Sequence, residues 1–215
     1  MIAVTFAVPN ESRGFLRLLG DRGQNVSVLH TGVGEKTCRE CIGRFLDSNR
    51  FEFLISSGFA GGVDPALRAG DLLLAENFSD PQLFARARII LGSSIGKLVT
   101  AGAVIESESD RQQFAVQNDA TAVDMETEFI ARACAERKLP MISLRAISDT
   151  AVAPFPAPPS VLFDIDRQRT DTPKLVAYFV KHPSQIVRLI HFARQIAHAR
   201  ARLTDGLSAV VRELA

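Results

Sequence analysis

Residues 141–149 read Met-Ile-Ser-Leu-Arg-Ala-Ile-Ser-Asp. A mainly apolar run such as 141–146 is typical of a strand buried on both faces, as in a parallel sheet. We therefore predict a strand here, with the Asp149 carboxylate just past its end, where open α/β sheets bind ligands. The alternative is that Asp149 is only a cap or turn residue before the proline-rich segment that follows.

Similar runs predict the rest of the sheet, with strands at 2–8, 26–30, 53–57, 71–75, 98–105 and 120–125. Helical patterns lie between them, at 12–19, 35–48, 109–117 and 126–137. Strands that alternate with helices predict an α/β fold, a three-layer sandwich around a central mixed, mainly parallel sheet.

The chain changes character after residue 150. Four prolines between 154 and 159 predict an extended, irregular path, and the patterns at 172–181 and 184–203 predict helices. We expect a single domain over 1–215 with a basic helical extension at about 172–215.

Composition excludes several classes of protein. With 215 residues, of which 47% are hydrophobic and 23% charged, the chain can bury a core without disulfides or metal. A formal net charge of +1 argues against a nucleic-acid partner. Three cysteines, no apolar run long enough to span a membrane and no signal-peptide pattern at the N-terminus lead us to expect a cytoplasmic protein.

Glycine-rich stretches follow two of the predicted strands, Gly-Val-Gly at 32–34 and Ser-Gly-Phe-Ala-Gly-Gly at 57–62. Glycines at these points allow the backbone to approach a ligand closely, and an ordinary strand-to-helix turn is the alternative at both.

Acidic residues gather at two further strand ends. Asp124, Glu126 and Glu128 surround a strand-to-helix junction, where favourable helix-start charge accounts for Glu128 better than for the other two. Asn10 and Glu11 follow the first strand, where they can equally be the cap and first turn of a helix.

No metal site or other cofactor is expected. Cys38 and Cys41 have the spacing of a metal-binding pair, but they fall inside a predicted helix and no second pair exists, so we interpret them as residues packed on the sheet. His191 and His198 are seven residues apart, about 10 Å along a helix, which is too far to share one metal.

Taken in this order, the motifs resemble the purine nucleoside phosphorylase/uridine phosphorylase superfamily, and within it the methylthioadenosine/S-adenosylhomocysteine nucleosidases. The most specific pieces are Ala-Val-Asp-Met-Glu at 122–126 and Arg-Ala-Ile-Ser-Asp at 145–149, and the resemblance runs from residue 1 to about residue 150. It implies cleavage of the N-glycosidic bond of a small-molecule purine nucleoside by a homodimer without a cofactor.

The resemblance also implies roles for the matching residues. Asp149 matches the acid that protonates N7 of the leaving purine, and Glu11 the carboxylate that activates water. Glu126 matches the carboxylate that binds the ribose hydroxyls, with Met125 packed against the sugar. The other residues expected to bind substrate are Val104, Ile105, Phe59, Ser148, Arg145 and Gly34.

The chemistry explains why carboxylates are needed. Glycosidic cleavage passes through an oxocarbenium-like state, and a purine leaves poorly unless it is protonated. Asp149 then needs a raised pKa, which we expect a closed apolar site to supply, whereas Glu11 must be ionised to accept a proton from water.

Two other activities stay open. In a phosphorylase, an Arg and a Ser around the glycine turn grip phosphate; Ser56 and Phe59 stand there instead, which favours water. A nucleoside- or lipid-binding protein that has lost catalysis is the third alternative. It is motivated by Gly102 and Val104, which replace the usual Asp and aromatic before the base site.

Two segments depart from the nucleosidases. Residues 76–98 are shorter than the insert that closes the 5′ side of the pocket, so we expect a more open 5′ site. The tail resembles hopanoid-associated phosphorylase-like proteins, which implies an adenosyl-lipid precursor as an alternative substrate.

The predicted helix at 184–203 combines an apolar stripe (Ile186, Leu189, Ile190, Ala193, Ile196 and Ala197) with a basic one (Arg188, His191, Gln195, His198 and Arg202). Residues 181–215 carry six Lys or Arg and two Asp or Glu, a net charge of +4, against −3 for residues 1–180. Such a helix either packs on the domain or makes peripheral contact with the inner face of an anionic membrane.

Overall fold

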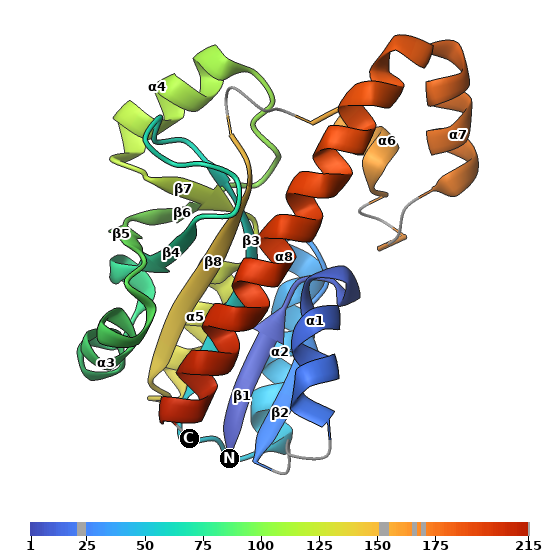
Figure 1. Cartoon of the computed structure of the whole chain (residues 1–215). Helices are drawn as coiled ribbons and strands as arrows, with labels where there is room; N and C mark the ends of the chain where they lie inside the picture. The colour runs from blue at the N-terminus through green and yellow to red at the C-terminus, as the bar shows by residue number, and fades with distance from the viewer. Residues whose placement is uncertain (21–24, 151–154, 165–166, 169–170, 215) are drawn as a thin grey trace.

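The computed structural model describes residues 1–20, 25–150, 155–164, 167–168 and 171–214 (Figure 1). Within this part of the chain, eight strands form one mixed sheet with helices on both faces. The strands are β1 (Ile2–Phe6), β2 (Val26–His30), β3 (Leu54–Gly62), β4 (Leu72–Ala75), β5 (Ser94–Gly96), β6 (Leu98–Thr100), β7 (Ala122–Asp124) and β8 (Met141–Asp149).

Strand β8 lies in the middle of the sheet, whose order is β2-β1-β3-β8-β4-β5, with β7 pairing to β3 and β6. It runs parallel to β3, from Leu54 opposite Met141 to Gly61 opposite Asp149, and antiparallel to β4. All nine residues of β8 are buried, which confirms the prediction from its apolar run. Because β1, β3 and β8 are parallel, their carboxyl ends meet at one edge.

Helices cover both faces of the sheet, so the predicted three-layer sandwich is confirmed (Figure 1). One face carries α1 (Pro9–Leu19), α3 (Pro81–Leu91) and the second half of α8 (Ile186–Leu214), packed through Phe15 and Leu207. The other face carries α2 (Glu35–Ser48) and α5 (Thr127–Glu136), packed through Ile42 and Ile130. The remaining helical segments are η2 (Glu76–Phe78), α4 (Glu108–Asn118), α6 (Pro159–Leu162), α7 (Thr172–Lys181) and η3 (Pro183–Gln185).

Helix α3 and strand β5 were not predicted from the sequence. The Asp80 side chain caps α3 by accepting hydrogen bonds from the amides of Gln82 (2.9 Å) and Leu83 (3.1 Å), and Pro81 fills the first helical position. Aspartate followed by proline is a regular helix-start signal, which the sequence interpretation passed over. The strand predicted at 98–105 ends at Thr100, because the chain turns away there to line the site described below.

The tail differs from its predicted form in two ways. The proline segment does not stay irregular, because Pro159 opens the short helix α6; residues 151–154 lie outside the described residues. Helix α8 continues to Leu214 instead of ending at 203, since Gly206 does not break it. In the described chain, no helix has both the length and the apolarity to cross a membrane.

The apolar stripe expected on this helix is mostly exposed. Within α8, every buried residue lies at or beyond Ala199, and these residues form a stripe of their own, Ala199, Leu203, Leu207, Val210 and Leu214. Packing on the domain is therefore correct for the second half of α8 and wrong for its first half.

A pair of glycine substitutions tests how tightly α8 packs against α1. A methyl group at Gly14 on α1 would lie 3.3 Å from both Cβ and Cγ2 of Thr204 on α8, and closer still to the Thr204 hydroxyl. A methyl group at Gly43 on α2 would meet nothing within 4 Å. We expect Gly43→Ala to raise the free energy of unfolding by about 0.5–1 kcal/mol and Gly14→Ala to lower it by about 1–3 kcal/mol. Urea denaturation measures both, and equal stabilisation would contradict the packing described.

Candidate functional site

A cavity of about 170 Å³ opens at the edge of the sheet where β1, β3 and β8 end. Most of the residues predicted to act on substrate line it: Glu11, Phe59, Val104, Ile105, Met125, Glu126, Ser148 and Asp149. They come from five separate segments of the chain, so only the folded sheet and its loops bring them together. No described residue between 62 and 102 lines the cavity; the more open 5′ side expected from the short 76–98 segment stays a prediction.

Two predicted substrate-binding residues lie behind the cavity wall instead. Arg145 is 2% exposed and donates hydrogen bonds to the Asp124 carboxylate and to the Ser56 hydroxyl. Gly34 is the residue before α2, where its φ of 87° suits glycine, and its amide donates to Glu126 (3.1 Å). Both positions were assigned to substrate contact, and both act on the carboxylates that line the cavity.

Three backbone amides hold the Glu11 carboxylate. Its Oε2 accepts from the amides of Ala7 (2.8 Å) and Val8 (3.1 Å), and its Oε1 accepts from the amide of Phe59 (2.9 Å). Gly58 makes room for the carboxylate, since a methyl group there would lie 3.1 Å from Oε1. Burial raises the pKa of Glu11, and the amide hydrogen bonds oppose that rise.

Glu11 thus lies in the first turn of α1 and also lines the cavity. Its interpretation as a helix-start residue is therefore compatible with its interpretation as a site residue. Asn10 is not the cap of α1, because the helix begins at Pro9 and the residue before it is Val8. The Asn10 side chain instead accepts a hydrogen bond from Arg200 of α8 (2.7 Å).

Glu126 faces the cavity, and no cationic side chain among the described residues forms an ion pair with it. Burial raises its pKa to about 8, the nearby Asp124 carboxylate adds to the rise, and the Gly34 hydrogen bond opposes it. At neutral pH these surroundings favour the protonated side chain.

Asp124 is the central acceptor of a buried hydrogen-bond network next to Glu126. It accepts from Arg145 Nε (3.1 Å) and Nη2 (3.0 Å), from the Thr100 hydroxyl (2.8 Å), and from the amide and hydroxyl of Thr127. The Thr127 hydrogen bonds fix the start of α5, so the same carboxylate orients a helix and an arginine.

Asp149 is paired with an arginine that the sequence interpretation missed. Arg111, on α4, is 2% exposed and forms an ion pair with Asp149 Oδ2, while the Ser148 hydroxyl donates to Oδ1 (2.6 Å). The apolar surroundings predicted for Asp149 are therefore wrong, because a guanidinium and a hydroxyl contact it. Nothing in the pattern singled out Arg111, since its neighbours in sequence are exposed and polar.

Arg111 also shapes the wall of the cavity. Its Nε donates to the carbonyl of Ile105 (2.9 Å) and its Nη1 to the carbonyl of Gly62 (3.3 Å). These bonds hold the loop that presents Val104 and Ile105 to the cavity. With Phe59 and Phe155, which also line it, this loop gives the cavity an apolar wall suited to a flat ring.

In the described residues, no group of three or more His, Cys, Asp and Glu side chains is placed to hold a metal ion. Cys38 is buried between α2 and α5, as expected of a packed helix residue, whereas Cys41 is partly exposed.

Comparison with known proteins points to one superfamily. Residues 84–181 match the model of the phosphorylase superfamily. A 5′-methylthioadenosine/S-adenosylhomocysteine nucleosidase of Staphylococcus epidermidis is 25% identical over an alignment of length 159, which covers 60% of this chain and 70% of the relative. The corresponding protein of Geobacillus kaustophilus is 27% identical over an alignment of length 161, which covers 60% of this chain and 68% of the relative.

Solved structures share the fold over the whole chain. The S. pneumoniae 5′-methylthioadenosine/S-adenosylhomocysteine nucleosidase, solved with a transition-state inhibitor, has a TM-score of 0.75 at 18% identity and covers 100% of this chain and 99% of its own. The futalosine hydrolase of Helicobacter pylori has a TM-score of 0.72 at 16% identity, with 99% and 97% covered. At such identities the likeness shows the fold alone.

The buried ion pair makes a prediction about stability. Arg111→Met leaves the Asp149 carboxylate buried without its cation, so the free energy of unfolding should fall by about 3 kcal/mol. Adding Asp149→Asn should recover part of that loss, since both charges are then gone. Arg132→Met, which breaks the exposed Arg132–Glu128 pair, is the matched control and should cost under about 1 kcal/mol. Guanidinium denaturation at pH 7 measures all three. Equal losses from the two arginine variants would contradict the burial of this pair.

The raised pKa of Glu126 predicts how stability depends on pH. Because this pKa is about 8 in the folded chain against 4.5 ordinarily, the folded state binds more protons between these values. Stability should therefore fall as pH rises from about 4.5 to about 8. Glu126→Gln is neutral throughout and should flatten that fall by an amount on the order of a few kcal/mol. Glu128→Gln, two residues away and exposed, is the control. Melting temperatures from pH 5 to 9 test this, and parallel curves for the wild type and Glu126→Gln would disprove it.

Proposed function

This chain carries a phosphorylase-superfamily domain, and from that premise we propose that it is a purine nucleosidase. It hydrolyses the N-glycosidic bond of an adenosine-type, 5′-substituted nucleoside and releases the free base. The observation that carries the proposal is the convergence of Glu11, Glu126 and Asp149 on one cavity with an apolar wall. Hydrolysis of such a bond needs a base for water, an acid for the leaving group and an anion near the cationic sugar.

Glu11 is the general base. Its two oxygens are oriented by three amides, so the carboxylate has a fixed direction toward the cavity. Those amides favour its ionised form against the effect of burial. The ionised carboxylate takes one proton from water as the water oxygen bonds to C1′ of the sugar.

Asp149 is the acid for the leaving base. Asp149, which pairs with Arg111 as a carboxylate, takes up one proton from water when the nucleoside binds. It gives this proton to N7 as the bond between C1′ and N9 breaks, so the purine leaves as a neutral molecule. The carboxylate left behind is stabilised by Arg111 and by the Ser148 hydroxyl, both already in place. Preorganised partners of this kind favour the transition state because no reorganisation is needed when the charge develops.

Glu126 binds the ribose hydroxyls, and Met125 covers the sugar beside it. Without bound substrate, burial favours the protonated form of Glu126 at neutral pH. Hydroxyl donors from the sugar replace the lost solvation and favour its ionised form. An ionised carboxylate beneath the sugar then stabilises the oxocarbenium-like state electrostatically.

Water is favoured over phosphate as the nucleophile. Arg111 is the only cationic side chain among the described residues that line the cavity, and it is already paired with Asp149. Ser56, which stands where a phosphorylase grips phosphate, is buried and bonded to Arg145. The described lining thus offers no unpaired cation for a phosphate ion.

A nucleoside with a larger substituent is the second candidate substrate, and one observation favours it. A second cavity of about 190 Å³ shares Phe155 with the first and extends to Tyr178, Gln185 and Arg188 of the C-terminal segment. A nucleoside that reaches past Phe155 has room there. The adenosyl-lipid expected from the resemblance of the tail is one such substrate. The homodimer and the cytoplasmic location expected from the sequence remain predictions.

The test is base release, followed by chromatography. The wild type is incubated with methylthioadenosine, S-adenosylhomocysteine, adenosine, inosine and a long-chain 5′-alkyl adenosine, each with and without phosphate. We expect free base without phosphate. Glu11→Gln and Asp149→Asn should each lower the rate by about 100-fold or more, because each removes one proton transfer.

Glu128→Gln, an exposed carboxylate beside the site, is the control and should stay within about twofold of the wild type, as expected of a residue outside the proton transfers. Base release that requires phosphate would replace the hydrolase by a phosphorylase. Full activity of Glu11→Gln would remove Glu11 from the mechanism. If no substrate releases a free base, the chain is better explained as a nucleoside- or lipid-binding protein without catalytic activity.

A further inference from the structure

The first half of α8 and the helix before it stand apart from the sandwich. Helix α7 turns back through η3 into α8, and this pair projects beyond the sheet and its covering helices (Figure 1). We refer to residues 172–198 as the C-terminal hairpin. On its inner side the hairpin has a small core of its own, in which Phe179 packs with Val161 and Ala157.

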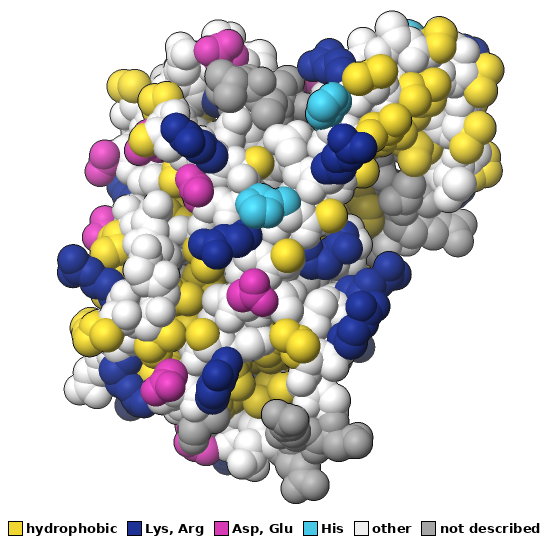
Figure 2. Space-filling view, viewed as in Figure 1, with side chains coloured by type: hydrophobic (Ala, Val, Ile, Leu, Met, Phe, Trp, Pro, Cys, Tyr) yellow, Lys and Arg dark blue, Asp and Glu magenta, His cyan; other side chains and the backbone are white. Residues whose placement is uncertain are grey.

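The outer side of the hairpin exposes large aliphatic side chains. Val176 is 56% exposed, Val180 75%, Ile186 43%, Val187 61% and Ile190 48%. Half of the exposed large hydrophobic side chains of the described chain thus fall between residues 176 and 190. Figure 2 shows hydrophobic side chains gathered over this hairpin. A patch of this kind marks an interaction surface, because folding alone gives no reason to keep it in water.

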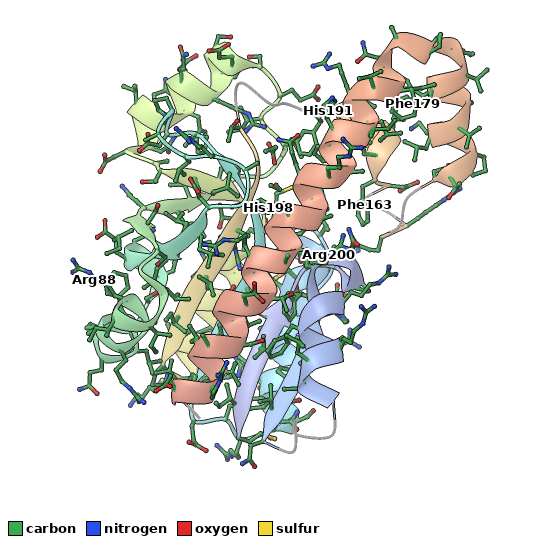
Figure 3. The ribbon with its side chains drawn as sticks, in the orientation of Figure 1. Arg88, Phe163, Phe179, His191, His198 and Arg200 are labelled. Carbon is green, nitrogen blue, oxygen red and sulfur yellow. The ribbon has the colours of Figure 1, made fainter. Side chains whose placement is uncertain are left out.

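All the Lys, Arg, Asp and Glu side chains of the same hairpin are cationic. Residues 172–204 contain six Lys or Arg and no Asp or Glu. On the hairpin itself, these are Lys174, Lys181, Arg188 and Arg194, and in the described structure none of the four forms an ion pair. Glu106 lines the same cavity as Arg188 without pairing to it. His191 and His198 lie along one side of α8 (Figure 3) and add no negative charge.

We propose that the C-terminal hairpin docks on the surface of an anionic lipid bilayer. Its valines and isoleucines enter the boundary between head groups and acyl chains, and its lysines and arginines contact the lipid phosphates. A second copy of this chain fits the surface poorly, because it would bring two sets of unpaired cations face to face. A bilayer supplies the negative charge and the apolar layer together.

The docking surface is connected to the candidate site through Phe155. This residue lines the cavity that holds Glu11 and Asp149, and its ring packs edge-on against Phe192 of α8, with 5.4 Å between ring centroids. The docking proposal itself rests on the exposed hairpin and not on the nucleosidase activity, so each can fail without the other.

Flotation of the full-length protein with vesicles tests the proposal. Vesicles of phosphatidylcholine with about one third phosphatidylglycerol are compared with pure phosphatidylcholine vesicles. We expect binding to the anionic vesicles only, and loss of that binding as salt rises from about 0.1 M to about 1 M, because the Debye length falls to about 3 Å.

Two sets of variants separate the contributions of charge and apolar contact. Lys174→Gln/Lys181→Gln/Arg194→Gln removes three cations, and Val180→Ser/Val187→Ser removes two aliphatic side chains. Each set should weaken vesicle binding by about tenfold or more. The matched controls are Arg17→Gln/Arg44→Gln/Arg88→Gln and Val116→Ser/Ile89→Ser, which change exposed residues outside the hairpin. Both should bind like the wild type. Arg88, for example, lies on α3, far from the hairpin (Figure 3).

Several results would overturn the docking proposal. One is no binding of the wild type to anionic vesicles. Another is equal binding of the hairpin and control variants. A change in oligomeric mass caused only by the hairpin variants, seen by analytical ultracentrifugation, would show that a second copy covers this face. Circular dichroism melts verify folding. Base release from soluble adenosine, unchanged in the hairpin variants, keeps the two proposals distinguishable.

Discussion

Buried negative charge at one edge of the sheet is the constraint on which the rest of this structure depends. Glu11, Asp124, Glu126 and Asp149 are all under 9% exposed, and they line one cavity at the edge of the sheet. Removing four carboxylates from water costs far more than a domain of this size can tolerate without compensation. The fold offsets that cost in two different ways, and the difference between them sets the chemistry.

Two of the carboxylates are compensated by buried guanidinium groups. Arg145 holds Asp124 and Arg111 holds Asp149, and both arginines are almost fully enclosed. The other two carboxylates, Glu11 and Glu126, are held by backbone amides, and burial raises the pKa of each. Charge-paired and amide-held carboxylates therefore face one cavity, which provides groups suited to different proton-transfer and binding tasks.

Helix α8 joins two environments. Its second half is a core element that packs on β8, α1 and α3, whereas its first half leaves the sandwich with apolar and basic side chains exposed. The contact between Phe155 and Phe192 lies where these regions meet, next to the cavity. The domain thus carries its candidate site and its largest group of exposed apolar side chains on opposite sides of one aromatic contact.

The sequence by itself determined the strand-and-helix order, the sandwich and the carboxylates at the strand ends, because burial on two faces and helical periodicity are local patterns. It also placed Glu126 and Asp149 at the site, since the strand that bears each one ends beside it. Only the tertiary structure decided that Arg111 pairs with Asp149, that Arg145 and Gly34 lie behind the wall, and that the first half of α8 stays exposed. Those facts depend on which distant segments meet in the fold. The burial of Arg111 cannot be predicted from the residues beside it, because they are polar and typical of an exposed helix.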